Sequence, residues 1–320
     1  MIEEYAELIP EDLVESFEEE PPVFFIGAGF GKEAVPPLKT GGELAQDLRG
    51  ELALPSDSGE GLAELLQYLQ NKSAGSKRVV VEWLRRKLLH SDSEPGGAHY
   101  LLLELSSQEL ITTNYDALLS TASRKIPGYT LHTVDEPGSY DSVLKNIPKE
   151  SREAVLARIH GGYESEDRIV ATTDDYIVNY TKEKKWPEIL KEKLRHQRVV
   201  FLGYSLRDFT TWTSYITMLA EWRHNKYPHV MVAPVSSPHI SLFWNNYGIQ
   251  YIPLKAYQFL IGLHDRLENL ESRESVAYAA AAACLGKSYD DSLMEIEQVQ
   301  SESGYTSPIR AALTIVEGTR

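Results

Sequence analysis

Four short, mainly apolar segments of the sequence each lead directly into a loop of glycine and small polar residues. The apolar segments are residues 23–26, 109–112, 156–159 and 198–202, and the loops after them occupy 27–31, 113–116, 160–162 and 203–205. Apolar runs of this length that end at such loops are typical of buried strands. Helical patterns separate the runs, and strands that alternate with helices pair in parallel. The sequence therefore predicts an α/β fold with a parallel sheet flanked by helices.

The rest of the chain is organised around this pattern. Residues 1–20 carry many acidic side chains and no base, at roughly helical spacing with apolar residues, which predicts an acidic amphipathic helix over 1–22. We expect one main domain over 23–270, with a helical insertion at about 41–98, a helix near 99–105 and two further strands at 229–235 and 249–254. The alanine-rich and then acidic end predicts a helical tail over 271–320.

Cysteine content and charge exclude several classes of protein. The chain of 320 residues has one cysteine, Cys284, so it can form neither an internal disulfide framework nor a zinc site of four cysteines. Its formal net charge of −15 argues against broad binding of phosphate backbones, and we expect no nucleic-acid partner. No stretch approaches the roughly 20 apolar residues of a membrane span, and the acidic start lacks the basic region of a signal peptide. We therefore expect a cytoplasmic protein with no membrane partner.

The loops after the strands are the first candidates for a site, because ligands of open parallel sheets bind outside the carboxyl ends of the strands. Glycines in the loop 27–31 would let the backbone approach a pyrophosphate, and a following helix would present free N–H groups to it. Lys32 holds the position of the third glycine in the dinucleotide fingerprint, so a purely structural turn is an equal alternative. The loop 203–205 is likewise either a phosphate or ribose cradle or a turn.

Asn114, Asp116 and His160 carry the polar chemistry of these loops. In an extended segment Asn114 and Asp116 face the same side, where an amide and a carboxylate would suit a carboxamide or ribose hydroxyls. The alternative is an Asx turn that caps the helix beginning near Ala117. His160 lies between an apolar strand and two glycines, where an imidazole could act as a general base, although a structural role is the alternative.

Taken together, the ordered motifs FIGAGFG (25–31), TTNYD (112–116), IHG (159–161) and FLGYSLRD (201–208) resemble the sirtuin-like NAD-binding family, particularly its bacterial branch. The segments ATTDDYIVNY (171–180) and GIQYIPL (248–254) support the resemblance, which covers approximately residues 20–265. It implies a Rossmann-like parallel sheet with an inserted helical subdomain and NAD bound between them.

The resemblance also implies roles for individual residues. Asn114 and Asp116 match a pair near the nicotinamide ribose and carboxamide, and His160 matches the catalytic histidine. The residues that would line the dinucleotide lie in the loops after the first, second and fourth apolar segments. They are Gly27, Ala28, Gly29, Phe30, Thr113, Gly203, Tyr204 and Ser205.

Two departures from the family refine the expected activity. Sirtuin deacetylases usually carry a four-cysteine zinc module, which a chain with only Cys284 cannot build, so we expect no zinc and no deacetylation. Gly31 stands where the family usually has serine. Resemblance to the zinc-less bacterial branch implies an NAD hydrolase, with NAD as substrate, that acts in anti-phage defence as an oligomer or with a partner protein. The alternatives are a non-catalytic subunit that senses NAD or ADP-ribose, and an ADP-ribosyltransferase.

Overall fold

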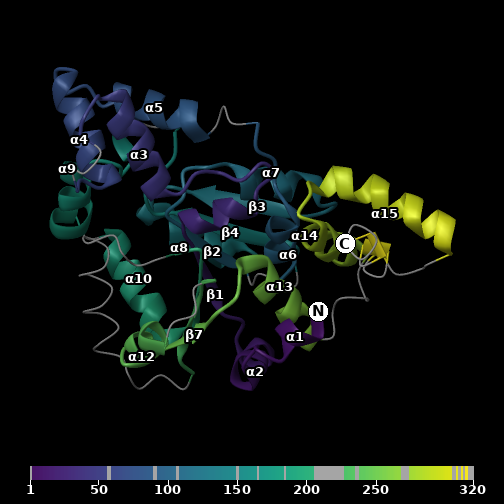
Figure 1. The fold of residues 1–320 in the computed structure, drawn as a ribbon. Coiled ribbons are helices and arrows are strands. Elements are labelled where there is room, and N and C mark those ends of the chain that lie inside the picture. The colour runs from purple at the N-terminus through teal and green to yellow at the C-terminus, as the bar shows by residue number, and fades with distance from the viewer. Residues whose placement is uncertain are drawn as a thin grey trace.

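The centre of the molecule is a seven-stranded sheet in the order β3-β4-β2-β1-β5-β6-β7, with every neighbouring pair parallel (Figure 1). The strands are β1 (Val23–Ile26), β2 (Glu109–Thr112), β3 (Thr130–Val134), β4 (Glu153–Arg158), β5 (Val199–Leu202), β6 (His229–Val232) and β7 (Ile249–Ile252). The Rossmann-like α/β class predicted from the sequence is confirmed. The structure, a computed structural model, describes residues 2–55, 59–88, 92–105, 108–148, 151–163, 166–183, 185–204, 227–234, 238–267, 274–304, 308, 311, 312, 314 and 315.

Strand β3 was not expected from the sequence. It forms one edge of the sheet, pairs only with β4, and leaves four of its five residues at least partly exposed. An edge strand of this kind does not need the continuous apolar run of a buried strand. The same criterion placed the start of β4 three residues too late, because the strand already begins at Glu153.

Alternation along the strands divides the core into two layers, one on each face of the sheet. In β1, Phe24 and Ile26 contribute to one apolar cluster and Val23 and Phe25 to the other. The first cluster is covered by α1 (Ile2–Ala6), α2 (Glu11–Glu19), α6 (Gly97–Leu105), α7 (Leu118–Lys125), α13 (Ala256–Arg266) and α14 (Glu274–Leu285). The second is covered by α8 (Pro137–Asn146), α10 (Lys185–His196) and α12 (Pro238–Asn245). Because successive side chains of a strand point to opposite faces, helices bury both faces of the sheet.

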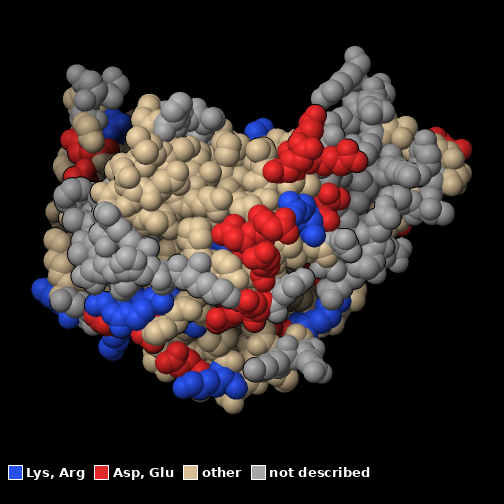
Figure 2. Space-filling view, turned by 90° about the horizontal axis from the view of Figure 1, so that it is seen from below, with Lys and Arg blue, Asp and Glu red and all other residues tan. Residues whose placement is uncertain are grey.

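The acidic N-terminal segment forms two helices instead of the single helix predicted over 1–22. Pro10 has extended backbone angles (φ −65°, ψ 140°) and separates α1 from α2. Leu13 of α2 is fully buried in the main core, and Arg198 forms an ion pair with Asp12. The two helices are therefore part of the α/β domain. They lie at the lower side of Figure 1, and Figure 2 shows acidic side chains gathered on the face seen from there.

The helical insertion consists of α3 (Gly41–Glu51), α4 (Leu62–Lys72) and α5 (Arg78–Leu88), which share an apolar cluster separate from the two sheet layers. A second segment, unanticipated from the sequence, joins it. Helix α9 (Thr173–Ile177) packs against α4 and continues into the π-helix η3 (Val178–Glu183). The insertion ends before Gly97, because α6 belongs to the main core.

The C-terminal residues 274–303 are helical, but α14 is packed into the domain instead of extending from it as a tail. A Cβ on Gly97 of α6 would lie 2.2 Å from the backbone nitrogen of Ala283, so only glycine permits this close approach. The rings of Tyr100 and Tyr289 stack at 4.4 Å, where α15 (Tyr289–Ser303) begins. None of the helices in the described part of the chain combines the length and apolarity of a membrane span.

Candidate functional site

The order of the strands places a topological switch point at the carboxyl ends of β1 and β5. The chain leaves β1 toward β2 on one side and later places β5 on the other, and such a switch point is where ligands of open α/β sheets bind. Ile26, Thr112, Arg158 and Leu202 end four adjacent strands in mutual register. The four loops predicted from the sequence therefore begin at one level along one edge.

The loops after β1 and β5 are locked together by backbone contacts. The N–H of Gly29 donates to the carbonyl of Gly203 at 2.8 Å, and that of Gly27 donates to Leu202 at 2.9 Å. Gly203 has φ +62°, and a Cβ there would lie 2.1 Å from the nitrogen of Phe30. Close packing of the two loops is therefore enough to require these glycines. This agrees with the alternative that the loops are structural turns.

Side chains of several residues predicted to bind NAD lie in the core. The ring of Tyr204 fills the space beside Gly27, where a Cβ would be 2.5 Å from its Cδ2 atom, and it packs on Phe25 at 5.1 Å. Phe30 is buried, with its ring edge-on to His99 at 4.8 Å. Ala28 is exposed at the start of η1 (Ala28–Glu33). Ser205 lies outside the described residues.

A cavity of about 720 Å³ opens beside the interlocked loops. Gly29, Gly203 and Tyr204 line it, together with Lys32, Lys255 and Lys287. This volume lies within the range of small-molecule sites. Of the three lysines, Lys32 is paired with Glu43 and Lys287 with Glu295, and Lys255 lies close enough to the buried Glu33 to act on its charge.

The cavity wall also contains an acid, Glu33. Burial raises the pKa of Glu33, although its carboxylate also accepts backbone hydrogen bonds from Tyr257 and Ala256 at the start of α13. The N-terminus of α13 is therefore already satisfied by a side chain of the protein.

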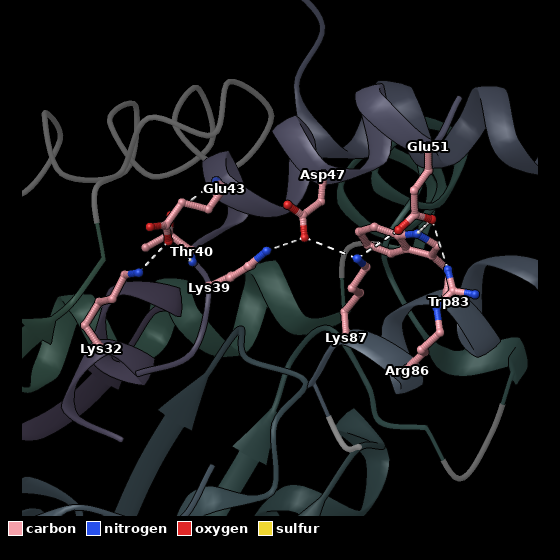
Figure 3. Close-up of polar contacts among 9 residues, drawn as sticks. All are labelled: Lys32, Lys39, Thr40, Glu43, Asp47, Glu51, Trp83, Arg86 and Lys87. Atoms are coloured by element: carbon pink, nitrogen blue, oxygen red, sulfur yellow. Dashed lines mark hydrogen bonds and ion pairs between the residues drawn. The ribbon is translucent and has the colours of Figure 1, made fainter. Parts of the chain in front are cut away.

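A ladder of ion pairs connects the loop after β1 to the helical insertion (Figure 3). Lys32 pairs with Glu43 at 2.5 Å, and the hydrogen bond from Lys32 lowers the pKa of Glu43 to about 2. A second run of ion pairs in the ladder joins Lys39 to Asp47, Asp47 to Lys87, Lys87 to Glu51, and Glu51 to Arg86. The position of Lys32 at the cavity thus depends on α3, whose first turn is closed by a capping box between Thr40 and Glu43.

Asn114 is held at the end of β2 beside the loop after β1. Its Nδ2 donates to the carbonyl of Gly27 at 3.1 Å, and its backbone N–H donates to the hydroxyl of Thr112 at 3.0 Å. The side-chain oxygen Oδ1 is buried and has no hydrogen-bond partner among the described residues. A buried amide oxygen normally has a donor, so this atom is a polar group that a ligand could satisfy. Thr113 follows β2 on the same edge, where its N–H donates to Ile26 at 3.1 Å.

Asp116 forms the Asx turn that was considered as the alternative to a binding role. Its Oδ1 accepts from the N–H of Leu118 at 3.1 Å, which forms the Asx turn before α7. Burial raises the pKa of the carboxyl, opposed by this bond, by a hydrogen bond from Asn114 and by the charge of Arg158. One oxygen is thus used by the turn, and the carboxylate remains within reach of Asn114.

His160 lies under a group of tyrosines at the end of β4. Its side chain is buried, and Nε2 is 2.9 Å from the hydroxyl of Tyr180. The rings of Tyr176 and Tyr180 meet the imidazole edge-on at 5.2 and 6.1 Å. Tyr115, the residue between Asn114 and Asp116, is 6.4 Å from the imidazole ring. Because Thr112 and Arg158 are paired in register, Asn114 and His160 each follow their strand by two residues, on neighbouring strands.

Sequence reasoning missed two groups that adjoin this site. Arg158 is buried at the end of β4 and binds both oxygens of Asp135, at 2.7 and 2.9 Å. In the sequence, Arg158 could have been found as the one charged residue of the apolar segment 156–159. The second group is the pair Tyr176 and Tyr180, which the sequence presented only as part of a family-like segment. Among the described residues, no three His, Cys, Asp or Glu side chains are grouped so as to hold a metal ion.

Comparison with known proteins shows what part of the chain resembles. A family model described as a SIR2-like domain matches residues 108–252, from just before β2 to the end of β7. Over this span the chain is similar to SIR2-like domains. The loop after β1 and the helical insertion precede the matched span.

Relatives of this chain include proteins with assigned names. NAD(+) hydrolase ThsA of Bacillus cereus is 24% identical over 63% of this chain, and ThsA of Acinetobacter baumannii is 27% identical over 65%. Defense-associated sirtuin 2 of Bacillus subtilis is 24% identical over 62%. The aligned regions cover 41% of each ThsA and 19% of the sirtuin, so the chain spans less than half the length of these relatives.

Proposed function

We propose that this protein hydrolyses NAD to ADP-ribose and nicotinamide and acts in bacterial anti-phage defence. The observation that carries the proposal is the buried amide oxygen of Asn114, which has no hydrogen-bond partner among the described residues. Asn114 follows β2, beside the loop after β1 and two residues before Asp116. The names of the relatives, two NAD(+) hydrolases and a defence-associated sirtuin, support the same substrate and setting.

NAD would extend along the edge formed by the carboxyl ends of the strands. Its phosphates and adenosine would occupy the cavity beside Gly29 and Gly203, where the phosphates would compete with Glu43 and Glu295 for Lys32 and Lys287. Its nicotinamide ribose would lie at Asn114, with the carboxamide N–H groups donating to Asp116. Because protein covers Asn114 Oδ1 and His160, we place a small opening of the surrounding loops before the chemical step.

The reaction would break the bond between C1′ of the ribose and the nicotinamide nitrogen. The electron pair of that bond leaves with nicotinamide, and an oxocarbenium-like centre forms at C1′. The oxygen of a water held by Asn114 Oδ1 then bonds to C1′, and His160 accepts the proton that the water loses. Positioning by the amide and proton transfer by the imidazole are separate contributions, so each can be tested by its own substitution.

The test is release of nicotinamide from NAD by the purified chain. We expect Asn114→Ala and His160→Ala each to reduce turnover by at least about a hundredfold, the lower end of what general acid–base groups contribute. Asn146→Ala and His196→Ala are matched controls, because both lie at the ends of helices on the surface and should retain wild-type turnover. Unimpaired turnover by either folded site variant would contradict the role given to that residue.

A sensing role without turnover is the second candidate, and Gly31 favours it. A Cβ at position 31 would lie 3.1 Å from the Cβ of Leu38, so packing disfavours the serine hydroxyl that the family usually places there. Binding of NAD with no nicotinamide release, in every mixture with partner proteins, would support sensing. Transfer of label from NAD to a protein would instead indicate an ADP-ribosyltransferase.

We also propose that the activity is controlled by self-association or by a partner protein. The acidic side chains of α1 and α2 provide a charged surface for such a contact (Figure 2). Measurement of the molar mass of the purified chain, alone and with candidate partners, tests this; a monomer of constant activity in all mixtures would contradict it.

A further inference from the structure

The hydroxyl of Tyr180 forms a side-chain hydrogen bond with the imidazole of His160. The distance between Tyr180 Oη and His160 Nε2 is 2.9 Å, and both side chains are buried, with 8% and 3% of their surface exposed. In so enclosed a place, a hydroxyl that bonds one ring nitrogen restricts both the orientation and the tautomer of the histidine.

The backbone around Tyr180 is unusual. Residues Val178–Glu183 form a π-helix directly after α9, and π-helical turns are rare and frequently lie at functional sites. The rings of Tyr176 and Tyr180 are stacked, with their centroids 5.9 Å apart and an interplanar angle of 17°. The planes of these two rings are at 83° and 82° to the plane of the imidazole. The π-helix thus brings a second tyrosine of the same stack to the ring nitrogen of His160.

The position of this segment is fixed from the helical insertion. The Nζ of Lys77, which precedes α5, donates to the carbonyl of Ile169 at 2.6 Å and pairs with the carboxylate of Asp175. Asp175 in turn accepts from the backbone of Thr172 at 2.9 Å, which closes the first turn of α9. Polar contacts therefore run from the insertion to α9, whose Tyr176 stacks on Tyr180.

We propose that Tyr180 is a positioning residue, held by the helical insertion, that orients the imidazole of His160 for NAD cleavage. The inference rests on the proposed function, since it assigns a role in that reaction. Tyr180 acts through His160 and is not itself given a contact with NAD. Loss of its hydroxyl leaves the ring contacts in place but removes the hydrogen bond to Nε2 of the imidazole.

Two measurements on Tyr180→Phe test the proposal, with Tyr176→Phe as the matched control because it removes the same atom from the neighbouring ring of the stack. We expect the nitrogen-15 resonance of His160 Nε2 to shift in Tyr180→Phe and to stay in place in Tyr176→Phe, with His160→Gln used to assign it. We expect kcat for nicotinamide release to fall about tenfold in Tyr180→Phe with KM near that of the wild type, as for a group that acts only on the chemical step.

The two readouts separate failure of this inference from failure of the proposed function. If the wild-type protein releases no nicotinamide, the proposed function fails, while the nitrogen resonance still reports whether Tyr180 holds His160. An unchanged Nε2 resonance in folded Tyr180→Phe overturns the inference, and so does an unchanged kcat beside a shifted resonance. Should Tyr180→Phe fail to fold, a wild-type Nε2 resonance typical of a nitrogen without a hydrogen bond would overturn it equally.

Discussion

Lowering the pH should destabilise the protein through His229, a buried histidine that the structure requires to be neutral. Its Nδ1 accepts the N–H of Val199 at 3.1 Å, and it also forms a backbone hydrogen bond with Leu194. A protonated imidazole has no acceptor nitrogen, so protonation would break the bond to Val199. Burial, reinforced by the charge of Arg198, lowers the pKa of His229 from 6.5 to about 4.

The direction and size of the effect follow from these two values. The unfolded chain takes up the proton near pH 6.5 and the folded chain only near pH 4, so stability is complete above pH 6.5 and decreases as the pH falls toward 4. For His229 alone the free energy of unfolding should decrease by about 1.3 kcal/mol between about pH 7.5 and about pH 5.5. Burial lowers the pKa of His99 to about 4 as well, so it should contribute a similar decrease.

Urea unfolding of the wild type and of His229→Asn at the two pH values measures this contribution. The Asn side chain places an oxygen acceptor where Nδ1 lies but does not titrate, so the variant should lose about half of the pH dependence that the two histidines cause. Other titrating groups are common to both proteins and cancel in the comparison. His196→Asn is the matched control on the surface and should follow the wild type. Equal pH dependence of His229→Asn and the wild type would refute the reasoning.

Two further predictions concern the loops and the ladder of Figure 3. Gly203→Ala combines φ +62° with a Cβ 2.1 Å from the nitrogen of Phe30, and it should destabilise the protein by more than about 2 kcal/mol. Gly128→Ala, with φ +71° and open space around the Cβ, should cost only about 1 kcal/mol; thermal unfolding compares the two, and equal losses would count against the packing of the two loops. Glu43→Gln weakens the capping box and releases Lys32, and in urea it should cost less than about 1 kcal/mol, a loss that high salt reduces. Because the pKa of Glu43 is lowered to about 2, that contribution should be complete above about pH 4.5 and disappear as the pH falls toward 2; a salt-independent effect would contradict the ion pair.

The sequence by itself determined the class of the fold and the edge of the sheet at which the candidate site lies. Short apolar runs that end at glycine or Asx residues are local signals, and the parallel sheet then brings the ends of adjacent strands to one level. The loops around Gly27, Asn114, His160 and Gly203 were therefore found without coordinates. The acidic pattern of residues 1–20 was also local, although it did not show that Pro10 divides the segment in two.

Only the tertiary structure decided what these residues contact. Gly203 is required by the nitrogen of Phe30, and His160 is bonded by Tyr180, in each case by a residue far away in the chain or on another element. The edge strand β3 and the joining of α9 to the insertion likewise depend on partners that no local period identifies. Periodicity reports which face of an element is apolar, whereas the partner on that face is selected by packing of the whole chain, and this is why the chemistry around His160 appeared only with the fold.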